Sequence, residues 1–189
     1  MRFQADFLLW TDAPRVGLEA ERRRITDRGL GGSLDGAAVG IPYLLAVTEQ
    51  FCVTGLDTLS SGYLPSGAPL VEKIWRDTFR DVESNWQKQR KAWKDWYGVS
   101  WSTFPGMKAL EGYQEARNTV MHGLGRLTPR QIGRDSGAET CRKLSEAGIS
   151  VYTNRIQVSR TNQRDCTFVC RDFIRWLDLQ AQASKPRPD

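Results

Sequence analysis

The side chains best suited to acid–base chemistry lie in one short segment, residues 115–123. It contains His122, the only histidine among 189 residues. Histidine is the side chain whose unperturbed titration falls closest to neutral pH, so His122 is the main candidate for moving a proton. Arg117 and Asn118 precede it in the same segment. A guanidinium beside an imidazole suits a phosphodiester, whose ribose hydroxyl or leaving oxygen can exchange a proton with the imidazole.

Four polar residues of this region share one arc of a helix, because each lies three or four positions from the next. They are Glu111, Glu115, Asn118 and His122, and the two carboxylates are expected to support the candidate catalytic residues. Arg117 lies about 140° from His122 around the helix, so its side chain must curl toward the arc or reach a neighbouring subunit. A structural interpretation stays open, in which His122 only caps its helix and Arg117 is an ordinary surface residue.

A helix capped by Ser102 or Thr103 and ending at Gly123 is expected to carry these residues. Its opposite side holds a set of small and apolar residues at helical spacing, which predicts burial: Leu110, Tyr113, Ala116 and Val120.

The rest of the chain predicts a mainly α protein with a small β-hairpin before the C-terminal helix. Residues 41–59 suit a buried helix, and residues 70–97 suit one long amphipathic helix. Alternation over residues 148–159 predicts the hairpin, around Asn154-Arg155. A last helix, capped by Thr161 or Asn162, has an apolar stripe that includes Cys166, Cys170 and Phe173.

Three segments follow from these elements. Residues 1–40 are expected to form an N-terminal helical extension with a Gly-rich linker, residues 41–182 one helical domain, and residues 183–189 a flexible tail.

The formal charge of +5 and the pI near 9.2 permit a polyanionic partner without requiring one. Lys88, Lys91 and Lys94 lie beside tryptophans in the predicted long helix and are candidates for binding RNA, as is Arg126, just after the histidine segment. The tryptophans themselves are more consistent with core, since aromatic stripes at helical spacing usually face inward.

Other classes of site have little support. Cys166 and Cys170 are one helical turn apart, but with a single histidine we expect core thiols and no metal or other cofactor. No Gly-x-Ser-x-Gly elbow accompanies His122, which disfavours a serine hydrolase. We expect no signal peptide, no membrane span in the apolar run at residues 37–47, and a cytoplasmic location.

Residues Arg117-Asn118-Thr119-Val120-Met121-His122 match the Arg-Asn-x-x-x-His motif of the HEPN superfamily, and residues 123–127 resemble the continuation in its RiboL-PSP branch. The resemblance covers about residues 41–182. It implies a helical bundle that dimerises through its motif helices and acts as a metal-independent endoribonuclease. It also implies that Arg117 and His122 act on the scissile phosphate while Asn118 positions them. Many such proteins are toxins or antiviral effectors.

Ribose transesterification commonly uses two proton-transfer groups, whereas this chain has one histidine. A homodimer with a composite site would supply the second, and an antitoxin or defence-system protein is a further possible partner. Two alternatives stay open: a HEPN-like module that binds RNA or a nucleotide without cutting it, and a structural or sensor subunit. The last predicts that Arg117 and His122 are buried against their own chain.

Overall fold

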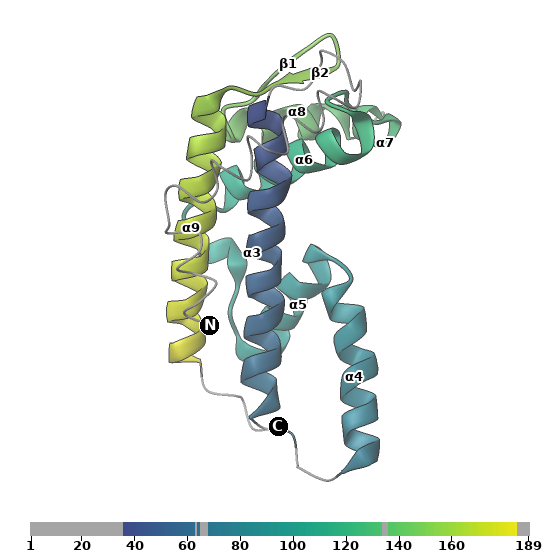
Figure 1. Ribbon diagram of the computed structural model, residues 1–189, viewed down its shortest axis with the longest axis vertical. Coiled ribbons are helices and arrows are strands. Elements are labelled where there is room, and N and C mark those ends of the chain that lie inside the picture. Colours follow the sequence, from purple (N-terminus) through teal and green to yellow (C-terminus); the bar gives the residue numbers. More distant parts are fainter. Residues whose placement is uncertain (1–35, 63, 65–67, 134–135, 185–189) are drawn as a thin grey trace.

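The computed structural model describes residues 36–62, 64, 68–133 and 136–184. This part of the chain is mainly α-helical, with one antiparallel hairpin just before the last helix, as the sequence predicts (Figure 1). Its elements are α3 (Gly36–Ser61), α4 (Pro69–Glu83), α5 (Trp86–Tyr97), the 3₁₀ helix η1 (Trp101–Thr103), α6 (Met107–Gly123), α7 (Pro129–Ile132), α8 (Gly137–Glu146), β1 (Ser150–Tyr152), β2 (Arg155–Gln157) and α9 (Arg160–Ala183).

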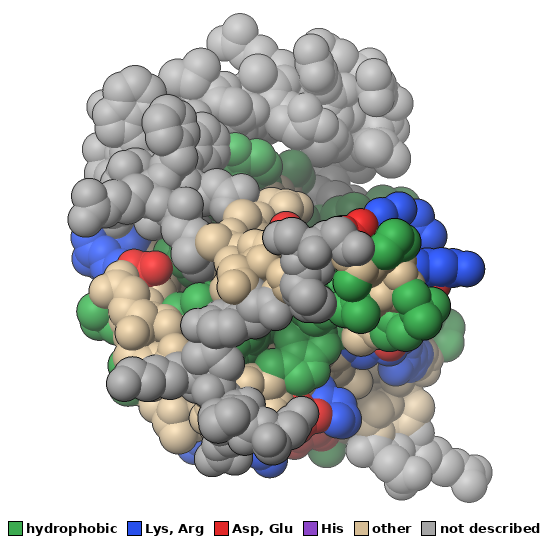
Figure 2. All heavy atoms as spheres, turned by 90° about the horizontal axis from the view of Figure 1, so that it is seen from below, with side chains coloured by type: hydrophobic (Ala, Val, Ile, Leu, Met, Phe, Trp, Pro, Cys, Tyr) green, Lys and Arg blue, Asp and Glu red, His purple; other side chains and the backbone are tan. Residues whose placement is uncertain are grey.

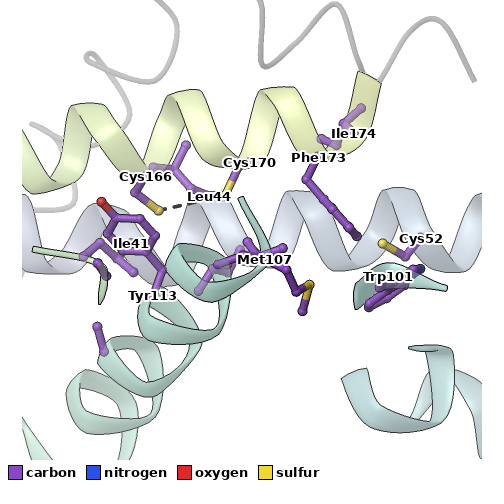
Figure 3. Packing of buried hydrophobic residues seen from close by; sticks show 14 of the residues in the cluster. Ile41, Leu44, Cys52, Trp101, Met107, Tyr113, Cys166, Cys170, Phe173 and Ile174 are labelled. Carbon is purple, nitrogen blue, oxygen red and sulfur yellow. Dashed lines mark hydrogen bonds between the residues drawn. The ribbon is translucent and has the colours of Figure 1, made fainter. Parts of the chain in front are cut away.

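Helices α3 and α9 lie side by side and run in the same direction, and their facing sides form the centre of the core (Figure 1). Ile41 and Leu44 of α3 lie near Cys166 and Cys170 of α9, with Tyr113 of α6 beside them (Figure 3). All five side chains are almost completely buried. The apolar stripe predicted for the last helix is therefore the face that α9 turns to α3.

Helix α3 begins at Gly36, so residues 36–40 are helical and not part of a linker as expected. The other residues of the predicted N-terminal extension, and most of the predicted tail, lie outside the described residues. By length and composition α3 is apolar enough to cross a membrane, contrary to the expectation from the shorter run at residues 37–47. Half of that apolar stretch is buried inside the fold, which is also typical of a core helix.

The prediction of one long helix over residues 70–97 is wrong. The chain breaks at Ser84-Asn85, where Asn85 is extended and its side chain accepts a hydrogen bond from the Lys88 amide at 2.9 Å. This N-cap starts a second helix. Helix α5 folds back on α4, and the rings of Trp75 and Trp96 meet at 5.3 Å between centroids. Trp75 thus contacts a tryptophan of the second helix, and the predicted aromatic residues do not lie on one continuous helix.

Burial of the tryptophan stripe is confirmed only in part. Trp93 is fully buried in the core, whereas the other aromatic residues of the stripe are partly exposed: Trp75, Phe79, Trp86 and Tyr97.

Helix α6 ends at Gly123 as predicted, and Leu124 follows in the left-handed conformation with φ 49°. Its predicted start is wrong, because Ser102 and Thr103 lie in η1 and α6 begins at Met107 after Gly106. The predicted inner side of α6 is confirmed, with buried side chains at Leu110, Tyr113, Ala116 and Val120.

The hairpin is confirmed, with Val151 opposite Ile156 in its register. Its turn residues are Thr153 and Asn154, both with positive φ, one position earlier than expected. Helix α9 is capped by Ser159 and not by Thr161 or Asn162. The Ser159 hydroxyl accepts from the Asn162 amide, and the Asn162 side chain accepts from the Ser159 amide, a reciprocal capping box.

Candidate active site

The outer side of the last two turns of α6 carries two of the three motif residues. Asn118 and His122 are exposed, and within the described residues neither forms a hydrogen bond or ion pair. Both side chains are therefore available to a ligand or to a second chain. The alternative of a structural or sensor subunit predicts that Arg117 and His122 are buried against their own chain. The exposure of His122 contradicts that prediction.

Arg117 has a partner that the sequence analysis missed. Its Nη1 donates to Oε2 of Glu49 on α3 at 3.0 Å. Arg117 retains 35% of its side-chain exposure and Glu49 retains 21%, so the pair is partly screened by water. One signal was present in the sequence: Glu49 follows an apolar run, and an acid in a half-buried helix usually has a partner. Local patterns could not show that this partner is Arg117, which lies 68 positions away in the sequence.

The predicted supporting carboxylates are held by other helices. Glu111 accepts from Nη1 of Arg90 on α5 at 2.9 Å. Glu115 lies 3.6 Å from Nζ of Lys143 on α8 and accepts from Nε2 of Gln131 on α7 at 3.2 Å. The arc predicted from helical spacing therefore divides in two. Its first half contacts neighbouring helices, while Asn118 and His122 face outward.

The lysines predicted to bind RNA lie on α5, near the other half of α6. Arg90 of that helix contacts Glu111, and Glu111 is about 16 Å from His122 along the helix axis. Lys88 and Lys91 form ion pairs with Asp81 and Asp95, whereas Lys94 is exposed and has no ion pair within the described residues.

The fourth predicted RNA-binding residue, Arg126, lies close to the motif. It follows His122 by four positions, is exposed, and forms a β-bridge with Arg155. Among the described side chains seen in Figure 2, basic and acidic groups are interspersed and form no continuous basic patch.

A hollow of about 600 Å³ lies beside α3, and Glu49 is among its lining residues. Asp57 of the same helix and Glu83 of α4 also line it. Three carboxylates repel a phosphodiester, so this hollow is unsuited to an RNA backbone.

The end of α6 is fixed by the buried side chain of Gln131. Its Nε2 donates to the Glu115 carbonyl at 3.2 Å, and its Oε1 accepts from the amide of Thr128 at 3.1 Å. It also exchanges hydrogen bonds with the Thr119 hydroxyl. One amide thereby ties α7 to the helix that carries the motif.

Replacing Gln131 by leucine is expected to lower the free energy of unfolding by roughly 1–3 kcal/mol, because the part-buried Thr128 amide loses its side-chain acceptor. Urea denaturation followed by circular dichroism measures the change. Gln87→Leu, at an exposed position of α5, is the control and should change little. Equal stability of both variants would contradict the positioning role.

The prediction that Cys166 and Cys170 are core thiols is confirmed. Both are fully buried, with 3.9 Å between their sulfur atoms. Burial raises the pKa of the Cys166 thiol, and that of Cys52, well above the usual value, so both are poor nucleophiles and poor metal ligands. Within the described residues no three potential ligands cluster as a metal site requires.

Comparison of the chain with family models, with curated proteins and with solved structures finds no match. The resemblance to the HEPN superfamily therefore stays a prediction from residues 117–127 and from the order of the helices.

Proposed function

We propose that this chain is a metal-independent endoribonuclease of the HEPN type. The observation that supports it is the state of the motif residues at the end of α6. His122 and Asn118 are exposed and have no hydrogen-bond partner in the described part of the chain. Arg117 is partly exposed and uses one nitrogen for its ion pair with Glu49, which leaves other N–H groups for a phosphate.

In the proposed reaction the ribose 2′-hydroxyl attacks the adjacent phosphorus. The new O2′–P bond forms as the P–O5′ bond breaks, which yields a 2′,3′-cyclic phosphate and a 5′-hydroxyl. One group removes the 2′ proton and another protonates the leaving oxygen. Arg117 stabilises the charge that develops on the phosphoryl oxygens, and Asn118 orients the phosphate by hydrogen bonding.

A second His122, from another copy of the chain, completes the pair of proton-transfer groups. Two large apolar side chains flank the histidine on the surface, Met121 with 59% and Leu124 with 54% exposure. Exposed apolar side chains next to each other and rimmed by polar residues are compatible with an interface. A two-fold axis near this end of α6 would bury these side chains and bring two histidines to one site.

The composite site predicts that one defective subunit inactivates the dimer. A heterodimer of wild type and His122→Ala, purified through two different tags, should cleave RNA almost as poorly as the His122→Ala homodimer. The heterodimer of wild type with Lys108→Ala, an exposed substitution in the first turn of α6, is the control. Half of the wild-type rate, or full activity of a monomer, would contradict the composite site.

A second candidate is a HEPN-like module that binds RNA or a nucleotide without cutting it. The ion pair between Arg117 and Glu49 favours it, because an arginine engaged within its own fold can serve structure alone. In that case His122→Ala leaves RNA binding intact and no wild-type cleavage product is detected. A role as toxin or antiviral effector, a cytoplasmic location and an antitoxin or defence-system partner belong to the nuclease proposal.

A further inference from the structure

The segment after α6 pairs with the hairpin through a single β-bridge. The Ile156 amide donates to the Gly125 carbonyl at 3.0 Å, and the Leu127 amide donates to the Asn154 carbonyl at 2.8 Å. These bonds flank a bridge between Arg126 and Arg155. β2 therefore has β1 on one side and residues 125–127 on the other.

This register puts three side chains in one row across the strands, because residues directly opposite each other point to the same face. Tyr152 is opposite Arg155 in the hairpin, and Arg155 is opposite Arg126 in the bridge. Tyr152 is 72% exposed, Arg126 is exposed and Arg155 between them is half-buried, so the row lies on the surface. The neighbouring residue Ile156 points to the other face and is buried in the core.

The two arginines lie directly opposite each other. They occupy a non-hydrogen-bonded pair of the ladder, in which Cα atoms lie about 4.5 Å apart and side chains approach most closely. Like charges at such positions destabilise a sheet. Within the described residues neither guanidinium forms an ion pair, so no acid of the fold offsets the repulsion. An anion between them would do so.

The row is also tied to the motif helix. The Gly125 amide donates to the Thr119 carbonyl at 3.1 Å, and the Arg126 amide donates to the Gly123 carbonyl at 2.9 Å. Arg126 is four residues from His122, which limits the separation of their Cα atoms to about 14 Å. A single strand held at Arg126 is therefore close enough to the exposed imidazole for one RNA to contact both residues.

We propose that Arg126, Arg155 and Tyr152 form a binding track for single-stranded RNA. The two guanidiniums bind consecutive parts of the phosphate backbone, and the Tyr152 ring stacks on an unpaired base. A single strand is the occupant because a protruding aromatic ring stacks only on bases that are not already stacked in a duplex. The choice of RNA as ligand rests on the proposed function.

Fluorescence anisotropy with a short labelled oligouridine tests the track, with every protein in the His122→Ala background so that the probe stays intact. Tyr152→Ala should weaken binding by about 5- to 100-fold. Arg155→Gln should weaken binding and lower by about one the slope of log affinity against log salt concentration. Arg155→Lys keeps the charge and should restore that slope. Arg175→Gln removes an exposed arginine about 22 Å along α9 from its start and should change binding little.

Unchanged binding by Tyr152→Ala and Arg155→Gln would overturn the track, and so would an equal loss in Arg175→Gln, which would mean a general charge effect. Equal affinity for an oligouridine–oligoadenosine duplex would overturn the single-stranded occupant. Loss of binding in these variants, with no cleavage by the wild type, keeps the track and refutes the nuclease. If these variants bind RNA normally and the wild type cleaves RNA, the track is refuted and the nuclease proposal is kept. Thermal unfolding without RNA shows whether each variant is folded.

Discussion

Gly112→Ala is expected to lower the free energy of unfolding by about 3 kcal/mol or more, the largest stability effect foreseen for a single methyl group in this fold. Gly112 lies where α6 crosses α8. A Cβ atom there would lie 2.1 Å from the Lys143 carbonyl oxygen and 2.7 Å from Cβ of Ala147. The first contact is with the backbone of α8 and the second with the Cβ of its C-cap residue, and neither group is a flexible side-chain end. Helix α8 must therefore move as a body and lose its packing on α6.

The matched control is Gly123→Ala on the same helix. There the new Cβ would meet Thr128 Cγ2 at 3.4 Å, an ordinary contact, and alanine favours a helix over glycine by up to about 1 kcal/mol. In urea denaturation, the midpoint of Gly112→Ala should therefore lie below that of the wild type and the midpoint of Gly123→Ala above it. Equal midpoints for Gly112→Ala and the wild type would show that α8 does not pack on α6 as described.

His122→Ala is expected to lower the rate of RNA cleavage by about 10²- to 10⁴-fold, the range typical of losing a general acid or base. Its free energy of unfolding should stay within about 0.5 kcal/mol of the wild type, because the side chain is exposed and has no hydrogen bond in the described part of the chain. Single-turnover cleavage of a labelled RNA, with analysis of the product ends for a cyclic phosphate, measures the first effect.

Lys108→Ala is again the control, since it is exposed on the same helix and remote from the motif. Cleavage by His122→Ala at the wild-type rate would refute the role of the histidine. If His122→Ala lowers both the cleavage rate and the free energy of unfolding, the result would instead favour the capping role, in which the imidazole stabilises the end of the helix.

Some elements were predictable because their determinants are local. The hairpin was visible in the alternation of Ile149, Val151, Ile156 and Val158, and the end of α6 in Gly123. The break between α4 and α5 was missed although it is also local. The apolar spacing continues across Ser84-Asn85, and only the cap formed by the Asn85 side chain reveals that the chain turns back.

Helix α8 was not predicted from the sequence, for a different reason. Its buried residues are few, Thr140 and Leu144, and the Gly112 position against which it packs lies far away in the sequence. A short helix of this kind is stabilised by packing more than by its own propensity, so its sequence carries a weak signal.

The sequence by itself determined which side chains can do chemistry: one histidine, preceded by an arginine and an asparagine on the end of a helix whose other side is apolar. Only the tertiary structure decided which partners the charged residues of this region contact. Arg117 pairs with Glu49, Glu111 with Arg90 and Glu115 with Lys143, while Arg155 is placed against Arg126. Helical periodicity fixes the direction in which a side chain leaves its own helix. The partner it finds depends on the packing of segments distant in the chain, which no local pattern encodes.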